Sequence, residues 1–118
     1  MLVAPPAGGE GAAEPPAQVD TAVQDCLRDL GGQDPEACDR ARVMTREAAL
    51  CITRSQQFAE GTAPWKAGIT YHYGERRIVW NVQNLLEDDG HGAQRGEYLR
   101  LDALHGALLG SGAWGATP

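Results

Sequence analysis

Apolar residues recur at helical spacing in the first third of the chain. Over residues 19–30 they form one stripe, made of Val19, Ala22, Val23, Cys26, Leu27 and Leu30. Apolar residues spaced three and four apart lie on one face of a helix. The pattern predicts an amphipathic helix over 19–30. Gly31 and Gly32 should end it, because glycine readily adopts the left-handed conformation found just past helix C-termini.

A second helix is predicted over residues 46–59. Thr45 is its expected N-cap, and Glu47 lies in the first turn, where a negative charge favours the helix. The face expected to pack inward consists of Ala48, Cys51, Ile52 and Ser55. Between the two helices, Asp34 and Pro35 have the order of an N-cap and a first helical residue, which predicts a short helical turn.

The second half of the chain alternates between apolar and polar residues, which is the period of a β-strand. The expected strands cover residues 69–73, 77–84 and 97–103, with a short last strand at 108–109. The side chains expected to face the helices are Ile78, Trp80, Val82, Leu99, Leu101 and Ala103. The sequence therefore predicts an α+β fold, with N-terminal helices packed on a three- to four-stranded antiparallel β-meander.

Composition divides the chain into a tether and one domain. Residues 1–18 are rich in proline, glycine and alanine, and we expect a flexible tether there. Residues 19–118 are long enough for a single small domain. No apolar run approaches the roughly 20 residues that span a bilayer. The net charge is −6 and no cluster of lysine or arginine is present, so nucleic acid is not an expected partner.

The three cysteines, Cys26, Cys38 and Cys51, allow at most one disulfide within the chain. Cys26 with Cys38 is the favoured pair, because it would pin the end of the first helix to the following loop. Closing a loop of this size contributes roughly 3 kcal/mol. Cys51 would then be a buried free thiol. A Cys38–Cys51 bond and three reduced cysteines in a cytosolic protein are the open alternatives.

No group of residues predicts a catalytic, metal or cofactor site. The acidic loop after the second strand has adjacent carboxylates, with Gly90 and Gly92 at positions where a cation would need further ligands. A solvated hairpin loop is expected instead. There is no Cys-x-x-Cys for zinc. Cys51 with His72 is the one pair that would suit a small thiol hydrolase, and we do not expect an enzyme.

Aromatic residues are the candidates for partner binding. Trp80 is expected in the core. Trp65 and Trp114, together with Tyr71 and Tyr73, admit two interpretations. They cover the ends of a small core, or they form an exposed aromatic patch for a protein partner.

The region over residues 45–110 resembles the PepSY-type domain. The opening of the second helix, Thr45-Arg46-Glu47-Ala48, resembles the start of the family's helix, and Ile78-Val79-Trp80-Asn81-Val82 resembles its middle strand. The segment from Leu99 to Leu109 resembles its last hairpin. The resemblance implies that Asp102 accepts backbone N–H groups in the turn and that Gly106 has a positive φ. The first helix and its cysteine lie outside the family's pattern.

The family resemblance implies a setting but no active site. PepSY-type domains are mostly extracytoplasmic and are associated with protease inhibition and protein binding. We therefore expect a non-catalytic protein-binding module of the bacterial cell envelope, the periplasm or the secreted fraction, with an inhibitory or regulatory role. The alternative is a structural accessory subunit or lipoprotein of an envelope assembly. Contact with a membrane would then run through a lipid anchor outside the given sequence.

Overall fold

The computed structural model describes residues 16–117 and confirms the α+β fold with an antiparallel sheet. Its helical elements are α2 (Pro16–Leu30), η1 (Pro35–Cys38), η2 (Arg40–Arg42) and α3 (Arg46–Ser55). Its strands are β1 (Lys66–His72), β2 (Arg77–Gln83), β3 (Glu87–Asp88), β4 (Gln94–Asp102) and β5 (Leu108–Ala116). The first fifteen residues of the expected tether lie outside the described residues. Residues 16–18 belong to α2, so the helix begins earlier than predicted.

The helix signals in the sequence describe the N-terminal half well. Gly31 and Gly32 follow α2 with φ of 61° and 81°, as a left-handed helix stop requires. The Asp34 carboxylate accepts the N–H of Ala37 at 3.3 Å and caps η1. The hydroxyl of Thr45 accepts the N–H of Ala48 at 3.1 Å and caps α3. All of these caps were predicted.

The second helix differs from its prediction in length and in rotation. It ends at Ser55 instead of continuing to residue 59, because Gln57 adopts a φ of 61°. The buried residues are Ala49 and Thr53, and Ile52 packs against the core as predicted. Cys51 and Ser55 are exposed, so their place on the inward face and the buried thiol were wrong. The Thr53 hydroxyl donates to the carbonyl of Ala49 at 2.8 Å. Because that bond satisfies the hydroxyl within the helix, a residue counted as polar can face the core.

The strands form one sheet in the order β1-β2-β4, with β5 on the far side of β4. All pairings are antiparallel, and a β-bulge interrupts the β4–β5 register between Arg100 and Leu101. The two-residue β3 pairs with the start of β4 and turns the acidic loop into a hairpin. The last strand is longer than predicted, with nine residues instead of two.

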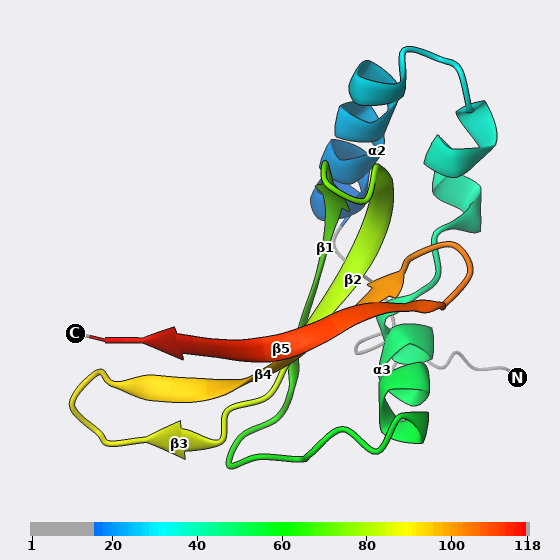
Figure 1. The fold of residues 1–118 in the computed structure, drawn as a ribbon. Helices are drawn as coiled ribbons and strands as arrows, with labels where there is room; N and C mark the ends of the chain where they lie inside the picture. The colour runs from blue at the N-terminus through cyan, green and yellow to red at the C-terminus, as the bar shows by residue number, and fades with distance from the viewer. Residues whose placement is uncertain (1–15, 118) are drawn as a thin grey trace, which may run out of the picture.

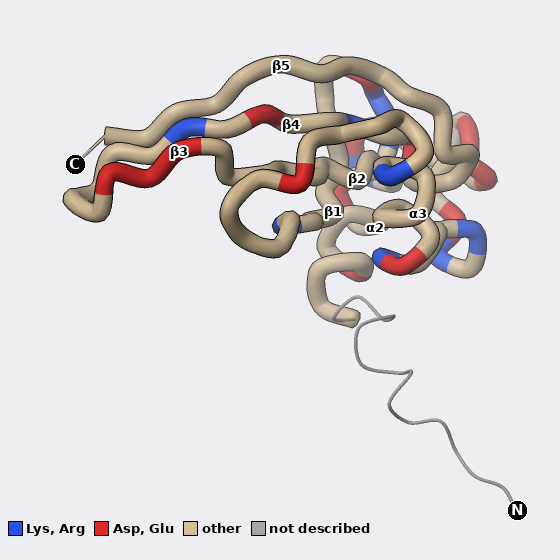
Figure 2. The backbone as a smooth tube through the Cα atoms, turned by 90° about the horizontal axis from the view of Figure 1, so that it is seen from below, with Lys and Arg blue, Asp and Glu red and all other residues tan. Residues whose placement is uncertain are grey.

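The core lies between the helices and one face of the sheet. All six side chains predicted to face the helices are buried, among them Trp80 and Leu101 at 0% exposure. Ile69 and Tyr71 of β1 share this face. Figure 1 shows α2 beside β1 and β2, whereas β3, β4 and β5 extend away from the helices as an arm. Figure 2, viewed from below, shows the same arm without a helix over its far end.

Candidate functional site

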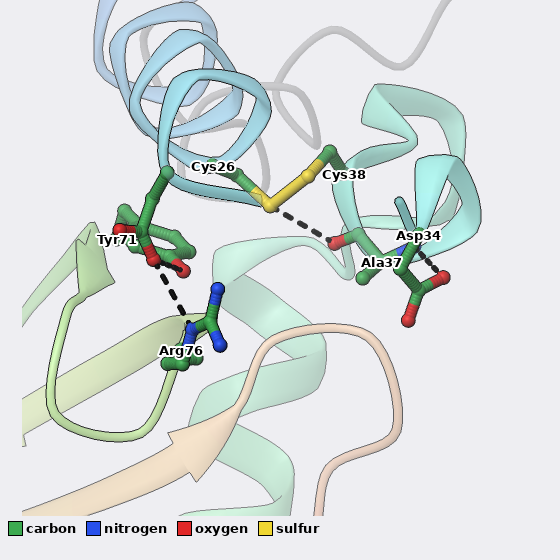
Figure 3. The surroundings of a disulfide bond; sticks show 7 residues. Cys26, Asp34, Ala37, Cys38, Tyr71 and Arg76 are labelled. Carbon is green, nitrogen blue, oxygen red and sulfur yellow. Dashed lines mark hydrogen bonds and ion pairs between the residues drawn. A yellow bond between two sulfur atoms is a disulfide. The ribbon is translucent and has the colours of Figure 1, made fainter. Parts of the chain in front are cut away.

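The predicted disulfide is present and clamps α2 to the turn that follows it. Cys26 and Cys38 are bonded, with 5.6 Å between their Cα atoms, and both are buried. Figure 3 shows the bond between α2 and η1, with Tyr71 of β1 and Arg76 of the β1–β2 turn close to the same helix. The alternative bond of Cys38 with Cys51 is therefore wrong, since Cys51 is an exposed free cysteine.

Tyr71 extends this clamp from α2 to β1. Its hydroxyl donates to the Asp29 carboxylate at 2.6 Å, and Arg76 donates to the same carboxylate oxygen at 3.4 Å. Burial, and then the bond to Asp29, raises the pKa of Tyr71 to about 12. The bond from Tyr71, and then the one from Arg76, lowers the pKa of Asp29 below its ordinary value. The end of α2 is thus bonded to both β1 and the β1–β2 turn.

The four candidate aromatic residues do not form one patch. Tyr71 is buried, with 3% of its surface exposed, so its assignment to an exposed patch was wrong. Tyr73 is 53% exposed and contacts the Tyr71 ring edge-on at 4.9 Å between centroids. Trp65 and Trp114 are half-buried at the other end of the sheet. Whether any of these residues binds a partner stays a prediction.

A buried asparagine that sequence reasoning missed bonds to Trp114 and shares a hydrogen-bond acceptor with Trp65. The Asn84 side chain donates to the carbonyl of Ala59 at 3.0 Å, and Trp65 Nε1 donates to the same carbonyl at 2.9 Å. The main-chain carbonyl of Asn84 accepts from Trp114 Nε1 at 2.9 Å. Asn84 is 1% exposed and also accepts the N–H of Glu97 at 2.6 Å. Asn84 therefore joins the linker before β1 to β4 and β5.

The residues considered for catalysis and metal binding are not brought together. No hydrogen bond joins Cys51 with His72 in the described residues, and His72 Nδ1 accepts the N–H of Glu75 at 3.0 Å. In the acidic hairpin, Asp88 accepts the N–H of Gly90, which lowers the pKa of Asp88. Residues 16–117 contain no group of three or more acids, histidines or cysteines that could hold a metal ion. None of their helices combines the length and apolar character needed to cross a membrane.

The edge of β5 is an open edge of the sheet. The Asn84 N–H donates to the Glu97 carbonyl at 3.0 Å, so the backbone groups of Glu97 point toward the β2 side of β4. Because backbone direction alternates along an antiparallel strand, Tyr98 points to β5, and its partner Gly112 points back to β4. The N–H and C=O groups of Ser111, Ala113 and Gly115 therefore point away from the sheet. They have no hydrogen-bond partner in the described residues.

On the outer face of the sheet, opposite the helices, large side chains of β4 lie over glycines of β5. A Cβ at Gly112 would stand 2.8 Å from the Tyr98 ring, and one at Gly110 would stand 3.6 Å from Arg100 Nη1. The Arg100 guanidinium stacks on the Tyr98 ring at 5.4 Å from its centroid. Since the glycines have no side chains, the ring and the guanidinium reach over β5 toward its free edge.

On the inner face, the same strand borders a hollow. It has a volume of about 560 Å³ and lies between the end of α3 and β5. The apolar residues around it are Phe58, Leu99 and Leu108, and Leu108 is 48% exposed. Gln56 and Gln57 form its helix side. Glu97 of β4 also borders the hollow. The free edge of β5 thus has a partly apolar hollow on one face and an aromatic–cation pair on the other.

Comparison with known proteins adds no relative. No family model, no curated protein and no solved structure matches this chain.

Proposed function

We propose that the chain is a non-catalytic protein-binding module that works outside the cytoplasm, in the bacterial cell envelope or the secreted fraction. The observation that carries the proposal is the free edge of β5. A nine-residue strand with unpaired backbone groups on one side is a template for a strand of another protein.

The disulfide supports the proposed compartment. Disulfides persist in oxidising compartments and are rare in the bacterial cytosol. Cys26 and Cys38 are buried and bonded, so the pair has a structural position in the core. The bond is compatible with an extracytoplasmic location, and the location itself is part of the proposal.

The turn after β4 supports the PepSY-type resemblance as a proposal. Asp102 Oδ1 accepts the N–H groups of Leu104 and His105 at 2.8 and 3.1 Å, and Gly106 has a φ of 75°. These are the two features that the resemblance implied for the turn. A kinship with this family would favour protein binding over catalysis, because the family has no shared catalytic residues.

Cross-linking in the native compartment tests the function. The full chain, carrying a photo-reactive group at Ser111, is expected to form a discrete adduct with a protein of the envelope or secreted fraction. The same group at Gln24 on the exposed side of α2 serves as the control and should give no such adduct. Absence of any protein adduct from either position, in extract and in cells, would contradict the proposed function.

A further inference from the structure

We infer that the edge of β5 binds an extended partner segment with two apolar residues and one acidic residue in alternating positions. The inference rests on the proposed protein-binding function and specifies its surface and its partner chemistry. The partner segment would run antiparallel to β5, as an additional strand about 4.8 Å away. It would bond to the backbone groups of Ser111, Ala113 and Gly115, which point away from the sheet.

The inner side of the incoming strand should be apolar. Side chains alternate between faces, so partner residues opposite Ser111 and Ala113 would point into the hollow beside α3. Phe58, Leu99 and Leu108 give that hollow its apolar surface. Two β-branched side chains in these positions would cover Leu108, which is 48% exposed in the free chain.

The outer side of the incoming strand should be acidic at one position. The partner residue opposite Gly110 would lie on the same face as Arg100, whose guanidinium extends over that glycine. No carboxylate in the described residues forms an ion pair with Arg100. A partner carboxylate here would make a charge-assisted hydrogen bond, one of the stronger polar contacts available at a surface.

Charge favours a different protein over a second copy of this chain. The sequence of β5, LLGSGAWGA, contains no carboxylate, so pairing of two β5 strands would bring no acid from the added strand to Arg100. Each copy also carries a net charge of −6, which opposes self-association. Pairing of β5 with a second β5 therefore supplies no acidic residue for Arg100, whereas a strand of another sequence can.

A synthetic peptide gives a direct probe. The sequence acetyl-Gly-Ser-Val-Thr-Ile-Asp-Thr-Ser-amide places valine and isoleucine on the inner side and aspartate opposite Gly110. In a titration of the isotope-labelled full chain followed by NMR, we expect saturable shifts at β5, Phe58 and Arg100. Absence of shifts at millimolar peptide, or shifts confined to β1, would overturn the inference.

Charge exchange at Arg100 tests the outer contact. Arg100→Glu should weaken binding of the aspartate peptide by about tenfold or more. The same variant should regain binding when lysine replaces aspartate in the peptide. Arg42→Glu, on η2 and away from the sheet edge, is the control and should leave both affinities unchanged. If Arg100→Glu and Arg42→Glu bind both peptides equally, the assignment of Arg100 is wrong.

A proline tests the edge itself. Ala113→Pro removes an N–H that points away from β4, so pairing within the sheet can persist while strand addition is blocked. Ala113→Val keeps the N–H and serves as the matched control. We expect loss of peptide binding in the proline variant alone, with circular dichroism unchanged in both. Equal binding by both variants would contradict strand addition.

Two further outcomes separate this inference from the proposed function. If the cross-linked partner is retained by both Arg100→Glu and Ala113→Pro, the chain binds proteins through another surface, and only the inference fails. A concentration-dependent dimer that Ala113→Pro abolishes would overturn the inference in favour of β5 pairing between two copies. Sedimentation of the full chain distinguishes that case.

Discussion

The two edges of the sheet differ in how the rest of the chain protects them. The edge formed by β1 begins with Lys66, and α2 packs along this strand. The carbonyl of Ile78 accepts the N–H of Ala103, so the backbone groups of Ile78 point toward β4. Because backbone direction alternates along each strand, the backbone groups of Ala67 point to the open side of β1. Arg46 donates to the carbonyl of Ala67 at 3.3 Å. The edge formed by β5 has no charged residue, and no helix of residues 16–117 packs along it.

This difference favours a binding role for β5. Proteins usually protect an edge strand with lysine, a covering helix or a shape that prevents pairing, because an open edge promotes aggregation. The chain uses such protection at β1. Leaving the longer strand at the opposite edge unprotected is what a surface for strand addition requires.

Removing the disulfide should cause the largest loss of stability, and the loss should be concentrated in α2 and β1. The double variant Cys26→Ala, Cys38→Ala is expected to lose about 3 kcal/mol of unfolding free energy, because the bond limits the unfolded chain. Urea denaturation measures the loss. Hydrogen exchange should accelerate more in α2 and β1 than in β5. Equal acceleration at both edges would show that the disulfide does not hold the β1 side in particular.

Two glycines give a matched test of packing at the two ends of the sheet. A Cβ at Gly96 of β4 would stand 2.1 Å from the carbonyl oxygen of Asn84, whereas one at Gly68 of β1 would meet nothing within 4 Å. Gly96→Ala should therefore cost about 2–3 kcal/mol and disturb β5. Gly68→Ala should stay within about 0.5 kcal/mol of the parent. Denaturation of the two variants makes the comparison, which fails if their stabilities are equal.

The bond from Tyr71 to Asp29 should contribute a smaller, pH-dependent part of the β1 clamp. Tyr71→Phe is expected to cost about 1 kcal/mol at neutral pH. The folded chain holds the Tyr71 proton until about pH 12, whereas the ordinary pKa is 10.0. The stabilisation is complete below pH 10 and is lost as the pH rises toward 12.

The pH dependence of unfolding tests this assignment. The parent should lose stability between about pH 10 and 12, and Tyr71→Phe should lose less over the same interval. Asp29, whose folded pKa is lowered, contributes stability that disappears as the pH falls below its ordinary value of 3.8. Identical alkaline profiles for parent and variant would remove Tyr71 from the clamp.

Cys51→Ser should have the smallest effect, because the thiol is exposed. The change in stability is expected to be under about 0.5 kcal/mol. A thiol reagent should label Cys51 in the folded parent without denaturant. Labelling only after unfolding would contradict the exposure of this side chain. The variant then provides a background without a free thiol for cross-linking at both edges.

The sequence predicted the N-terminal half better than the C-terminal strand, for a physical reason. Caps such as Thr45 and stops such as Gly31 act through local hydrogen bonds and local dihedral angles, which neighbouring residues determine. The strand β5 has four small residues in a row, from Gly110 to Ala113. Its large apolar residues are confined to the two leucines before this run and to Trp114 after it. Glycine weakens strand propensity, so the pairing with Tyr98 and Arg100 supplies what the local sequence lacks.

The burial of Tyr71 and of Asn84 depends on tertiary contacts, which the alternation of apolar and polar residues cannot predict. Tyr71 and Tyr73 are two residues apart and are expected on the same face. The position of α2 decides that Tyr71 is buried and Tyr73 is exposed. Asn84 follows β2 as an ordinary polar residue, yet its amide is buried because Ala59 and Glu97 both bond to it. The cysteine pairing was predictable, since the end of α2 and the loop after it are close in sequence.

Amide hydrogen exchange of the full chain, with and without the aspartate peptide, tests the difference between the two edges most directly. In the free chain, Ser111, Ala113 and Gly115 should exchange fast while Gly112 and Trp114 are protected. With peptide, the three fast amides of β5 should become protected, and Ile69 and Tyr71 at the β1 edge should not change. Protection that appears at β1, or at neither edge, would contradict the account.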